Sequence, residues 1–350
     1  MQQSKKLEIA KNIKELKPKN NSSSYSYAYR ISQLFDYVAI LRPILLIPGW
    51  TMTLMGYYRA IRSDLSNQIF IPFFGEVGFV TNLHREITIT LFLYSLLMGA
   101  VYILNQLTDS NADAINGKLY LIPYGHLKKS HMKNQIIILF VVSIILSFLN
   151  LSITCSFLIL FSAIMGIIYS VPPIRLKGKP ILDLLANAFG FGIIAFSVGW
   201  TSKSNISLNL LLDSIPYFLC VSSAFINTTI PDMEGDIRNG DKTTGIFLGI
   251  RKSCLVSTVI LILVIAVSLY RRDIVPLIAS VVSLPFFIYM TISNWGNKTD
   301  IRAISLATKI SVLTLSLLVS LLIPFYFVIL VLTILLVRLY YQVRFRVSYP

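Results

Sequence analysis

Charged side chains are scarce in this sequence of 350 residues. Asp, Glu, Lys and Arg together make up 13% of the chain, whereas 55% of the residues are hydrophobic and the mean hydropathy is +0.70. A soluble globular domain carries roughly 25% charged residues. The composition therefore excludes an ordinary soluble domain and indicates a protein embedded in a membrane.

Cysteine and histidine are also rare, with three residues of each. The cysteines, Cys155, Cys220 and Cys254, lie in or beside apolar segments and show neither metal-ligand spacing nor a pairing pattern. The histidines form no cluster along the chain. These absences argue against a zinc centre and against a disulfide framework.

Long apolar segments recur along the chain, each close to the twenty or so residues needed to cross a hydrocarbon core of roughly 30 Å. We predict nine spans, at about 37–58, 86–107, 134–150, 154–171, 183–200, 209–229, 253–270, 274–294 and 304–338. The last segment is too long for one straight span and contains Pro324, so it is either a kinked helix or a tight pair. The sequence predicts an all-α, polytopic bundle and leaves nine versus ten spans open.

The two ends of the chain are polar. Residues 1–36 carry six lysines and the run NNSSSYS, a composition typical of a mobile, cytosolic tail. Residues 37–338 form the predicted transmembrane domain, and residues 339–350 form a short basic C-terminal tail.

The net charge of +15 follows the predicted topology. In the nine-span arrangement, the loops on the N-terminal side contain 13 Lys and Arg, against six in the opposite loops. Cytoplasmic loops of membrane proteins are enriched in these residues. We therefore expect the N-terminus and these loops to be cytoplasmic, and we do not expect nucleic acid as a partner. Arg338, Arg344 and Arg346 fit ten spans better.

Acidic residues number only 16, and six of them fall in two short segments that each follow an apolar span. NQLTDSNAD places Asn105, Asp109 and Asp113 four residues apart, and IPDMEGDIRNGD contains Asp232 and Asp236 at the same spacing. On a helix, residues four apart share a face. Solvated loop acids are the simpler interpretation of either segment alone, but two like-spaced segments on one side of the membrane favour a functional site.

Carboxylates gathered at the edge of a low-dielectric bundle repel one another unless a cation lies between them. Oxygen ligands without nearby Cys or His favour a hard cation, and Mg²⁺ suits a site that shares coordination positions with phosphate oxygens. The predicted Mg²⁺ ligands are Asn105, Asp109, Asp113, Asp232 and Asp236. Glu234 and Asp241 are interpreted as solvated neighbours.

Basic residues accompany the acids on the same predicted side. The loop YSVPPIRLKGKP contributes Arg175 and Lys177, and Arg238 and Lys242 follow the second acidic segment. Arg and Lys beside metal-holding carboxylates form a site for a polyanion such as diphosphate. A diphosphate site that opens into a helical bundle in lipid implies a substrate with a long apolar tail.

These motifs resemble those of the UbiA-type intramembrane prenyltransferase family. NQLTDSNAD is similar to the family's NxxxDxxxD motif, DMEGD to its DxxxD motif, and YSVPPIRLKGKPILDLLANA to the segment between them. Arg42-Pro43 matches an Arg-Pro common at the head of the first span, and the resemblance covers about residues 37–338. Many members read NDxxDxxxD; Gln106 stands at the second position here, so one accessory ligand is not matched.

The resemblance implies nine helices around a central cavity open to lipid, with a prenyl diphosphate held through Mg²⁺ at the cytoplasmic mouth. Loss of diphosphate would leave an allylic carbocation, which an electron-rich acceptor attacks. The expected diphosphate contacts are Arg42, Asn105, Arg175, Lys177, Arg238 and Lys242. The residues expected to carry catalysis are Asp109, Asp113, Asp232, Asp236 and Lys177. Tyr102 and Tyr169 lie near the motifs, where packing is their simpler role.

The acceptor is less well defined. IPDMEGDIRNGDKTTG resembles homogentisate-type prenyltransferases, enzymes that attach geranylgeranyl groups to glyceryl phosphate and, more distantly, chlorophyll synthases. We expect a lipophilic aromatic, quinone-precursor-like acceptor, with a glycerol-phosphate-type lipid or a chlorophyll-like molecule as the alternative. An alternative of another class is a secondary transporter, which would show ionisable groups or broken helices near the bilayer midplane.

Overall fold

The computed structural model describes residues 31–65, 68–110, 113, 121–122, 125–296, 299–347 and 349. Residues 1–30 lie outside this part of the chain, so the predicted mobile tail over residues 1–36 is described only from Ile31 onwards.

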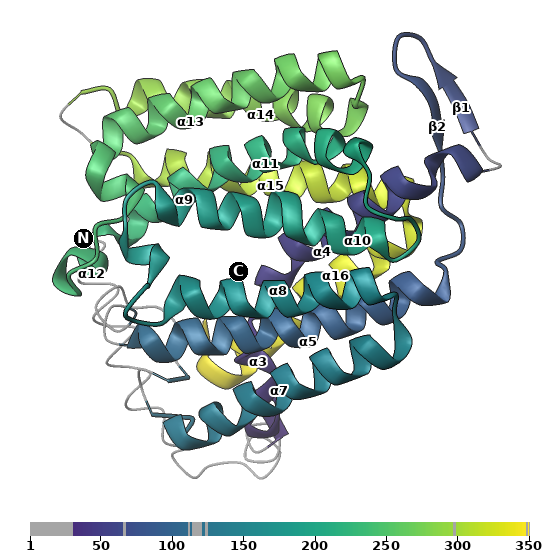
Figure 1. Ribbon diagram of the computed structural model, residues 1–350. Coiled ribbons are helices and arrows are strands. Elements are labelled where there is room, and N and C mark those ends of the chain that lie inside the picture. The colour runs from purple at the N-terminus through teal and green to yellow at the C-terminus, as the bar shows by residue number, and fades with distance from the viewer. Residues whose placement is uncertain are drawn as a thin grey trace.

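Helices make up most of the described chain (Figure 1). The long ones are α4 (Pro43–Ile61), α5 (Arg85–Thr108), α7 (Lys129–Asn150), α8 (Ile153–Ser170), α11 (Leu208–Thr229), α13 (Thr244–Arg271), α14 (Ile274–Ser293), α15 (Ile301–Leu322) and α16 (Pro324–Phe345). The short ones are α3 (Asp36–Ala39), η1 (Arg62–Asp64), η2 (Leu176–Gly178), α9 (Leu182–Asn187), the π-helix η3 (Ala188–Ala195), α10 (Phe196–Thr201), η4 (Ile230–Asp232) and α12 (Met233–Arg238). Two antiparallel strands, β1 (Gln68–Ile71) and β2 (Gly75–Gly78), form a hairpin that was not predicted.

Nine helices of the described chain are long and apolar enough to cross a membrane, and the bent pair 31–39 and 43–64 adds a tenth. The predicted all-α, polytopic bundle is therefore confirmed. The long predicted segment 304–338 is a pair of helices, α15 and α16, because Pro324 ends one helix and starts the next. α16 continues to Phe345, so the first residues of the predicted C-terminal tail are helical.

The bundle has two ends, which differ in their connections (Figure 1). We call the end at which α5 stops and α9 begins the motif end, because both acidic segments lie there, after α5 and after α11. The opposite end carries the β1–β2 hairpin, and we call it the hairpin end. Asp36, before α4, and Arg344, in the last turn of α16, are in contact at the motif end. The chain therefore enters its first long helix and leaves its last one at the same end of the bundle.

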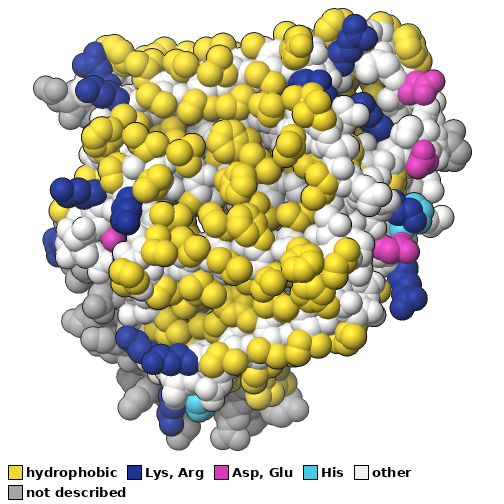
Figure 2. All heavy atoms as spheres, in the orientation of Figure 1, with side chains coloured by type: hydrophobic (Ala, Val, Ile, Leu, Met, Phe, Trp, Pro, Cys, Tyr) yellow, Lys and Arg dark blue, Asp and Glu magenta, His cyan; other side chains and the backbone are white. Residues whose placement is uncertain are grey.

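The face of the bundle seen in Figure 2 is largely apolar, and charged side chains gather toward its edges. Large exposed apolar side chains come from the outward faces of α7, α13 and α16, among them Ile137, Leu263, Leu335 and Leu339. A soluble monomer rarely exposes so continuous an apolar surface, and helices satisfy their own backbone groups in lipid. The chain is a multi-pass integral membrane protein.

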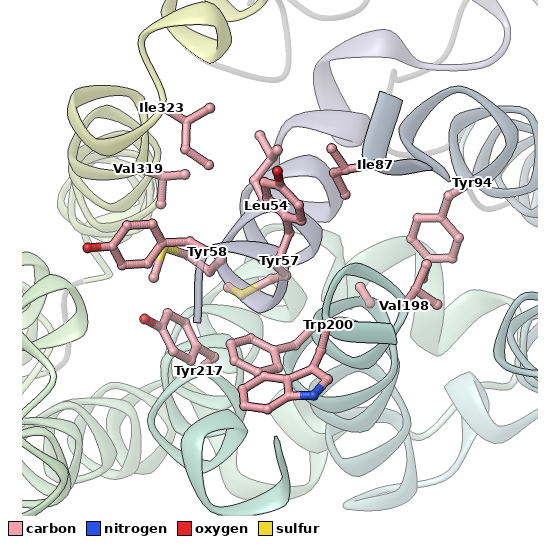
Figure 3. Packing of buried hydrophobic residues seen from close by; sticks show 14 of the residues in the cluster. Leu54, Tyr57, Tyr58, Ile87, Tyr94, Val198, Trp200, Tyr217, Val319 and Ile323 are labelled. Carbon is pink, nitrogen blue, oxygen red and sulfur yellow. The ribbon is translucent and has the colours of Figure 1, made fainter. Parts of the chain in front are cut away.

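A tightly packed core joins α4 to α10 (Figure 3). Tyr57 and Trp200 belong to this core, and two glycines let the helix backbones approach each other. A Cβ atom at Gly56 would lie 1.8 Å from a carbonyl oxygen of α10, and one at Gly199 would lie 1.7 Å from a carbonyl oxygen of α4. Membrane helices commonly use small residues at such crossings, so this contact requires glycine on both helices.

A buried ionic network holds the hairpin end together. Arg59 of α4 lies 2.8 Å from an Asp213 oxygen on α11 and 3.6 Å from an oxygen of Asp273, which precedes α14. Arg271 of α13 donates to the other Asp213 oxygen at 2.7 Å. Arg59 and Asp213 are 154 residues apart in the chain. The network ties four helices together at the end of the bundle away from the motifs.

Candidate active site at the motif end

The first acidic segment lies where α5 ends. Asn105 is in the last turn of α5, and Asp109 follows the helix as its C-cap, its backbone N–H donating to the Asn105 carbonyl at 2.9 Å. The Asp113 N–H donates to the Asp109 carbonyl, also at 2.9 Å. The helical repeat over these three residues is what their four-residue spacing predicts.

Lys177 reaches this segment from the loop between α8 and α9. Its ammonium group forms an ion pair with the Asp109 carboxylate, and it donates to Asn105 Oδ1 at 2.8 Å and to Thr108 Oγ1 at 3.1 Å. The residue is only 8% exposed. Burial lowers the pKa of Lys177, and the Asp109 carboxylate opposes that shift without cancelling it. A cationic side chain thus bridges two predicted metal ligands.

Arg175 joins the two acidic segments. Its guanidinium donates to both oxygens of Asp241, at 2.9 and 2.7 Å, and to Asp109 Oδ1 at 3.1 Å. The hydrogen bonds to Asp241 raise the pKa of Arg175. Burial acts to raise the pKa of Asp241, but hydrogen bonds from Arg175 and Asn239 outweigh it and bring the pKa below its ordinary value. Asp241 is therefore not the solvated neighbour that we expected, because both oxygens of its carboxylate accept hydrogen bonds from the Arg175 guanidinium.

The loop between α8 and α9 is docked against the segment that precedes α13. The Lys242 N–H donates to the Gly178 carbonyl at 3.0 Å, and the Thr244 N–H donates to the buried Asp183 carboxylate at 2.7 Å. Arg175 has a left-handed backbone with φ of 41°, a conformation that costs a non-glycine residue roughly 1–2 kcal/mol. Strained residues of this kind concentrate at functional sites. The loop is thus held in a shape that brings its two cations to the acids.

The second acidic segment approaches from α11. Asp232 ends η4 and precedes α12, and Asp236 lies one turn further along. Asp236 is close enough to Asp232, Asp241 and Asp109 to interact with their charges, so the two acidic segments converge. Across the described ranges, no three Asp, Glu, His or Cys side chains are grouped closely enough to hold a metal ion. An ion at this site needs further oxygen donors, such as the Asn105 amide or a bound phosphate.

A cavity of about 480 Å³ extends into the bundle from Asn105 and Asp232. Its lining does not include their neighbours Asp109, Arg175, Lys177 and Asp236. Arg42, Asn105 and Asp232 line its motif end, together with Tyr102 and Tyr169. The remaining lining residues are apolar or small and polar, for example Met98, Met165, Phe191, Ser280, Ser311 and Leu315. Of the lining side chains in the described chain, Arg42 and Asp232 alone are charged. The cavity therefore has a charged mouth and an uncharged interior.

The two cavity tyrosines hold neighbouring elements in place. The Tyr102 hydroxyl donates to the Leu45 carbonyl at 2.7 Å, and the Tyr169 hydroxyl accepts from Asn187 Nδ2 at 2.7 Å. Their rings line the cavity at the same time. Packing and cavity lining are thus combined at both positions.

Two predicted diphosphate contacts lie at the surface beside the cavity mouth. Arg238 is exposed and donates to Glu234 at 2.7 Å within α12, and the Lys242 side chain is also exposed. Neither residue lines the cavity. Their roles as diphosphate contacts stay predictions.

Gln106, the departure from the common motif, is buried and does not line the cavity. Its Nε2 donates to the Ile40 carbonyl at 2.8 Å and to the Tyr102 carbonyl at 3.0 Å. Gln106 therefore serves as a structural contact between α5 and the chain segment before α4. Sequence reasoning also missed Thr108 as a partner of Lys177; its position directly before Asp109 was the available signal.

The fold and the site define a class: a helical intramembrane bundle whose cavity opens beside converging acidic and basic side chains. The sequence model described as the UbiA prenyltransferase family matches residues 73–313, which is more than half of the chain and includes both acidic segments. The chain belongs to the UbiA prenyltransferase family.

Individual relatives carry two kinds of name. The chain is 28% identical to digeranylgeranylglyceryl phosphate synthase from Sulfurisphaera tokodaii over 52% of this chain and 65% of that protein. It is 27% identical to probable homogentisate phytyltransferase 2, chloroplastic, from Oryza sativa subsp. japonica, over 49% of this chain and 47% of that protein. The chain thus spans less than two thirds of the length of these relatives.

The fold is similar to that of a UbiA homolog from Archaeoglobus fulgidus bound to DMAPP and Mg²⁺. The TM-score is 0.59, the sequence identity is 16%, and the match covers 81% of this chain and 99% of the other. At this identity the likeness establishes the fold, and it agrees with the predicted bundle of about nine helices.

Proposed function

We propose that this protein is a membrane prenyltransferase, which moves a prenyl group from a prenyl diphosphate to a lipophilic acceptor and releases diphosphate. One observation carries the proposal: Lys177 and Arg175 meet Asn105 and Asp109 at the motif end, and Asn105 also lines the charged mouth of an otherwise uncharged cavity. The mouth suits a phosphorylated head group, and the interior suits an apolar chain. Membership of the UbiA prenyltransferase family supports the same function.

The donor set at the mouth fits Mg²⁺. The predicted ligands all offer oxygen atoms, and Mg²⁺ is commonly held by one or two carboxylates together with substrate phosphates and water. Such a shell needs no group of three protein carboxylates. Lys177 and Arg175 lie between the acids, so cations are already accommodated there. The residues that would hold Mg²⁺ are Asn105, Asp109, Asp113, Asp232 and Asp236.

The cationic side chains provide electrostatic stabilisation of the leaving group. When bound, Mg²⁺ would neutralise part of the diphosphate charge and so favour its departure. Lys177 and Arg175 would bind the remaining oxygens as the carbon–oxygen bond breaks and its electron pair passes to diphosphate. Arg42 lines the same mouth. The apolar cavity wall keeps water from the resulting allylic cation until the acceptor attacks.

The acceptor is proposed to be a glycerol-phosphate-type lipid. The relative from Sulfurisphaera tokodaii, whose name specifies a glyceryl phosphate product, supports this class over the aromatic acceptor that we expected from the motifs. The Oryza sativa relative keeps an aromatic acceptor as the second candidate. Both acceptors use the same donor chemistry, so the choice between them does not alter the roles proposed for the mouth.

Product analysis tests the proposal. Purified protein in lipid nanodiscs would receive labelled geranylgeranyl diphosphate with either geranylgeranylglyceryl phosphate or homogentisate, in Mg²⁺ or in EDTA. We expect Mg²⁺-dependent diphosphate release and a prenylated glycerol-phosphate lipid by mass spectrometry. Product from homogentisate alone would establish the aromatic acceptor. If folded wild-type protein releases no diphosphate with either acceptor in the presence of Mg²⁺, the proposal that it is an enzyme is overturned.

A further inference from the structure

The hinge between α3 and α4 places Arg42 at the cavity mouth. The two helical segments that meet there are bent by 42°. Arg42 lies at the bend in a left-handed conformation with φ of 53° and ψ of 62°, which is unfavourable for a residue with a side chain. Such a conformation persists only where surrounding contacts hold it. The described chain provides these contacts from two other helices, α5 and α16.

The first support comes from α5, whose last turn contains Asn105 and whose C-cap is Asp109. Gln106 Nε2 donates to the Ile40 carbonyl at 2.8 Å, two residues before the bend, and Gln106 is 3% exposed. Tyr102, one turn earlier on α5, donates to the Leu45 carbonyl at 2.7 Å, beyond the bend. The same helix therefore carries the predicted metal ligands and fixes the backbone on both sides of Arg42.

The second support comes from α16. Arg344 donates to both oxygens of Asp36 at 3.0 Å, and the Tyr340 hydroxyl donates to Asp36 Oδ1 at 2.6 Å. Asp36 and Arg344 are both almost fully buried. The three residues lie outside residues 73–313, the part matched by the family model. A buried ion pair is poor at adding net stability, but its fixed geometry can specify one arrangement.

We propose that Gln106 and the Asp36–Arg344 ion pair are positioning residues that hold Arg42 in the orientation in which it binds the diphosphate of the substrate. This proposal rests on the proposed function. Gln106 sets the distance from the hinge to α5 and its acids, and Asp36–Arg344 fixes the helix before the hinge. Together they reduce the freedom of Arg42 before the substrate arrives, so less ordering is required on binding.

The test is a double-mutant cycle that includes Arg42. Gln106→Leu and Arg344→Gln would each be made in the wild-type and in the Arg42→Ala background, with Arg344→Lys as the conservative variant. The measurements are KM and kcat for geranylgeranyl diphosphate and the Kd of inorganic diphosphate with Mg²⁺. In the wild-type background we expect each variant to raise the donor KM and the diphosphate Kd by about two- to tenfold, the range of a single hydrogen bond, with a smaller change in kcat. Arg344→Lys should recover part of the loss.

The Arg42→Ala background separates positioning from general stability. If the supports act through Arg42, they add no further loss of diphosphate binding once Arg42 is removed, because coupled residues are not additive. Equal losses in both backgrounds would show a general effect on the fold and overturn the proposal. Tyr326→Phe is the matched control: it removes a buried hydroxyl from the other end of α16 and should leave diphosphate binding unchanged.

Two further outcomes distinguish this proposal from the proposed function. If wild-type protein transfers prenyl groups but Arg42→Ala leaves the donor KM and the diphosphate Kd unchanged, Arg42 is not a contact and the positioning proposal fails while the function stands. If wild-type protein neither binds diphosphate nor transfers prenyl groups, the function itself fails. Thermal unfolding in detergent identifies any variant that is not folded; Arg344→Lys, which keeps the charge, then provides the decisive comparison.

Discussion

The ammonium nitrogen of Lys177 lies 2.8 Å from Asn105 Oδ1, although 72 residues separate the two in the chain. This contact joins a basic loop to the first acidic motif. It also places a positive charge beside Asp109 before any substrate is bound. The basic and acidic motifs therefore act as one unit, and each of the following predictions addresses a part of that unit or of the bundle that supports it.

Replacing Lys177 with Ala should reduce catalytic efficiency by roughly ten- to a hundredfold, because a hydrogen bond to a charged group is worth about 1.5–3 kcal/mol. The deficit should be the same with two chemically different acceptors, since the leaving group is common to both. Lys177→Arg should recover only part of the loss, because a planar fork replaces a compact ammonium. Steady-state kinetics with both acceptors provides the measurement, and a deficit confined to one acceptor would contradict the diphosphate role.

Asp109→Ala and Asp236→Ala should both abolish turnover but should differ in stability. Asp109 pairs with Lys177 and Arg175, so its removal should lower the free energy of unfolding by about 1–3 kcal/mol. Asp236 has other acids as neighbours, and its removal relieves repulsion, so stability should be unchanged or slightly higher. Thermal unfolding without Mg²⁺, together with activity assays, would check both parts. Near-wild-type turnover in either variant would count against the site.

Gly199→Ala should destabilise the bundle by about 1–3 kcal/mol, because the added methyl group would overlap with the backbone of α4. Gly190 is the matched control in the same membrane span, since a Cβ atom there has nothing within 4 Å. Gly190→Ala should therefore leave the unfolding midpoint unchanged or higher. Equal midpoints for the two variants in the same detergent would refute the close helix crossing.

The motif end should face the cytoplasm. Lys179 lies in the loop after α8 and Lys203 in the loop after α10, at opposite ends of the bundle, and both are exposed. Lys179→Cys and Lys203→Cys, each in a background without the three native cysteines, should be labelled from opposite sides of a sealed membrane. We expect cytoplasmic labelling at position 179, in line with the excess of Lys and Arg on that side. Labelling of both positions from one side would contradict the topology.

Much of the fold was predictable from sequence because each membrane span is encoded in one continuous apolar stretch of residues. A run of apolar residues of membrane-crossing length indicates a helix wherever it packs, so most span boundaries were predicted within a few residues. The starts of α4, α7 and α13 and the end of α16 differ more. The hairpin of β1 and β2 was missed, since each strand has only four residues and so provides little periodicity. The split of the last segment at Pro324 was left open, because proline in a membrane helix permits either a kink or a break.

The sequence by itself determined the helices and their order, and it predicted oxygen ligands at the site, because apolar runs and spacings of four residues act within a single helix and need no partner. Only the tertiary structure decided which charges meet. Asp241 holds Arg175, Gln106 supports the hinge of Arg42, and Asp36 pairs with Arg344, 308 residues away. Such pairs depend on how distant helices pack and on which groups become buried together. The spacing of residues along one helix specifies neither the packing of distant helices nor which groups are buried together. The geometry of the site is therefore set only when the bundle folds.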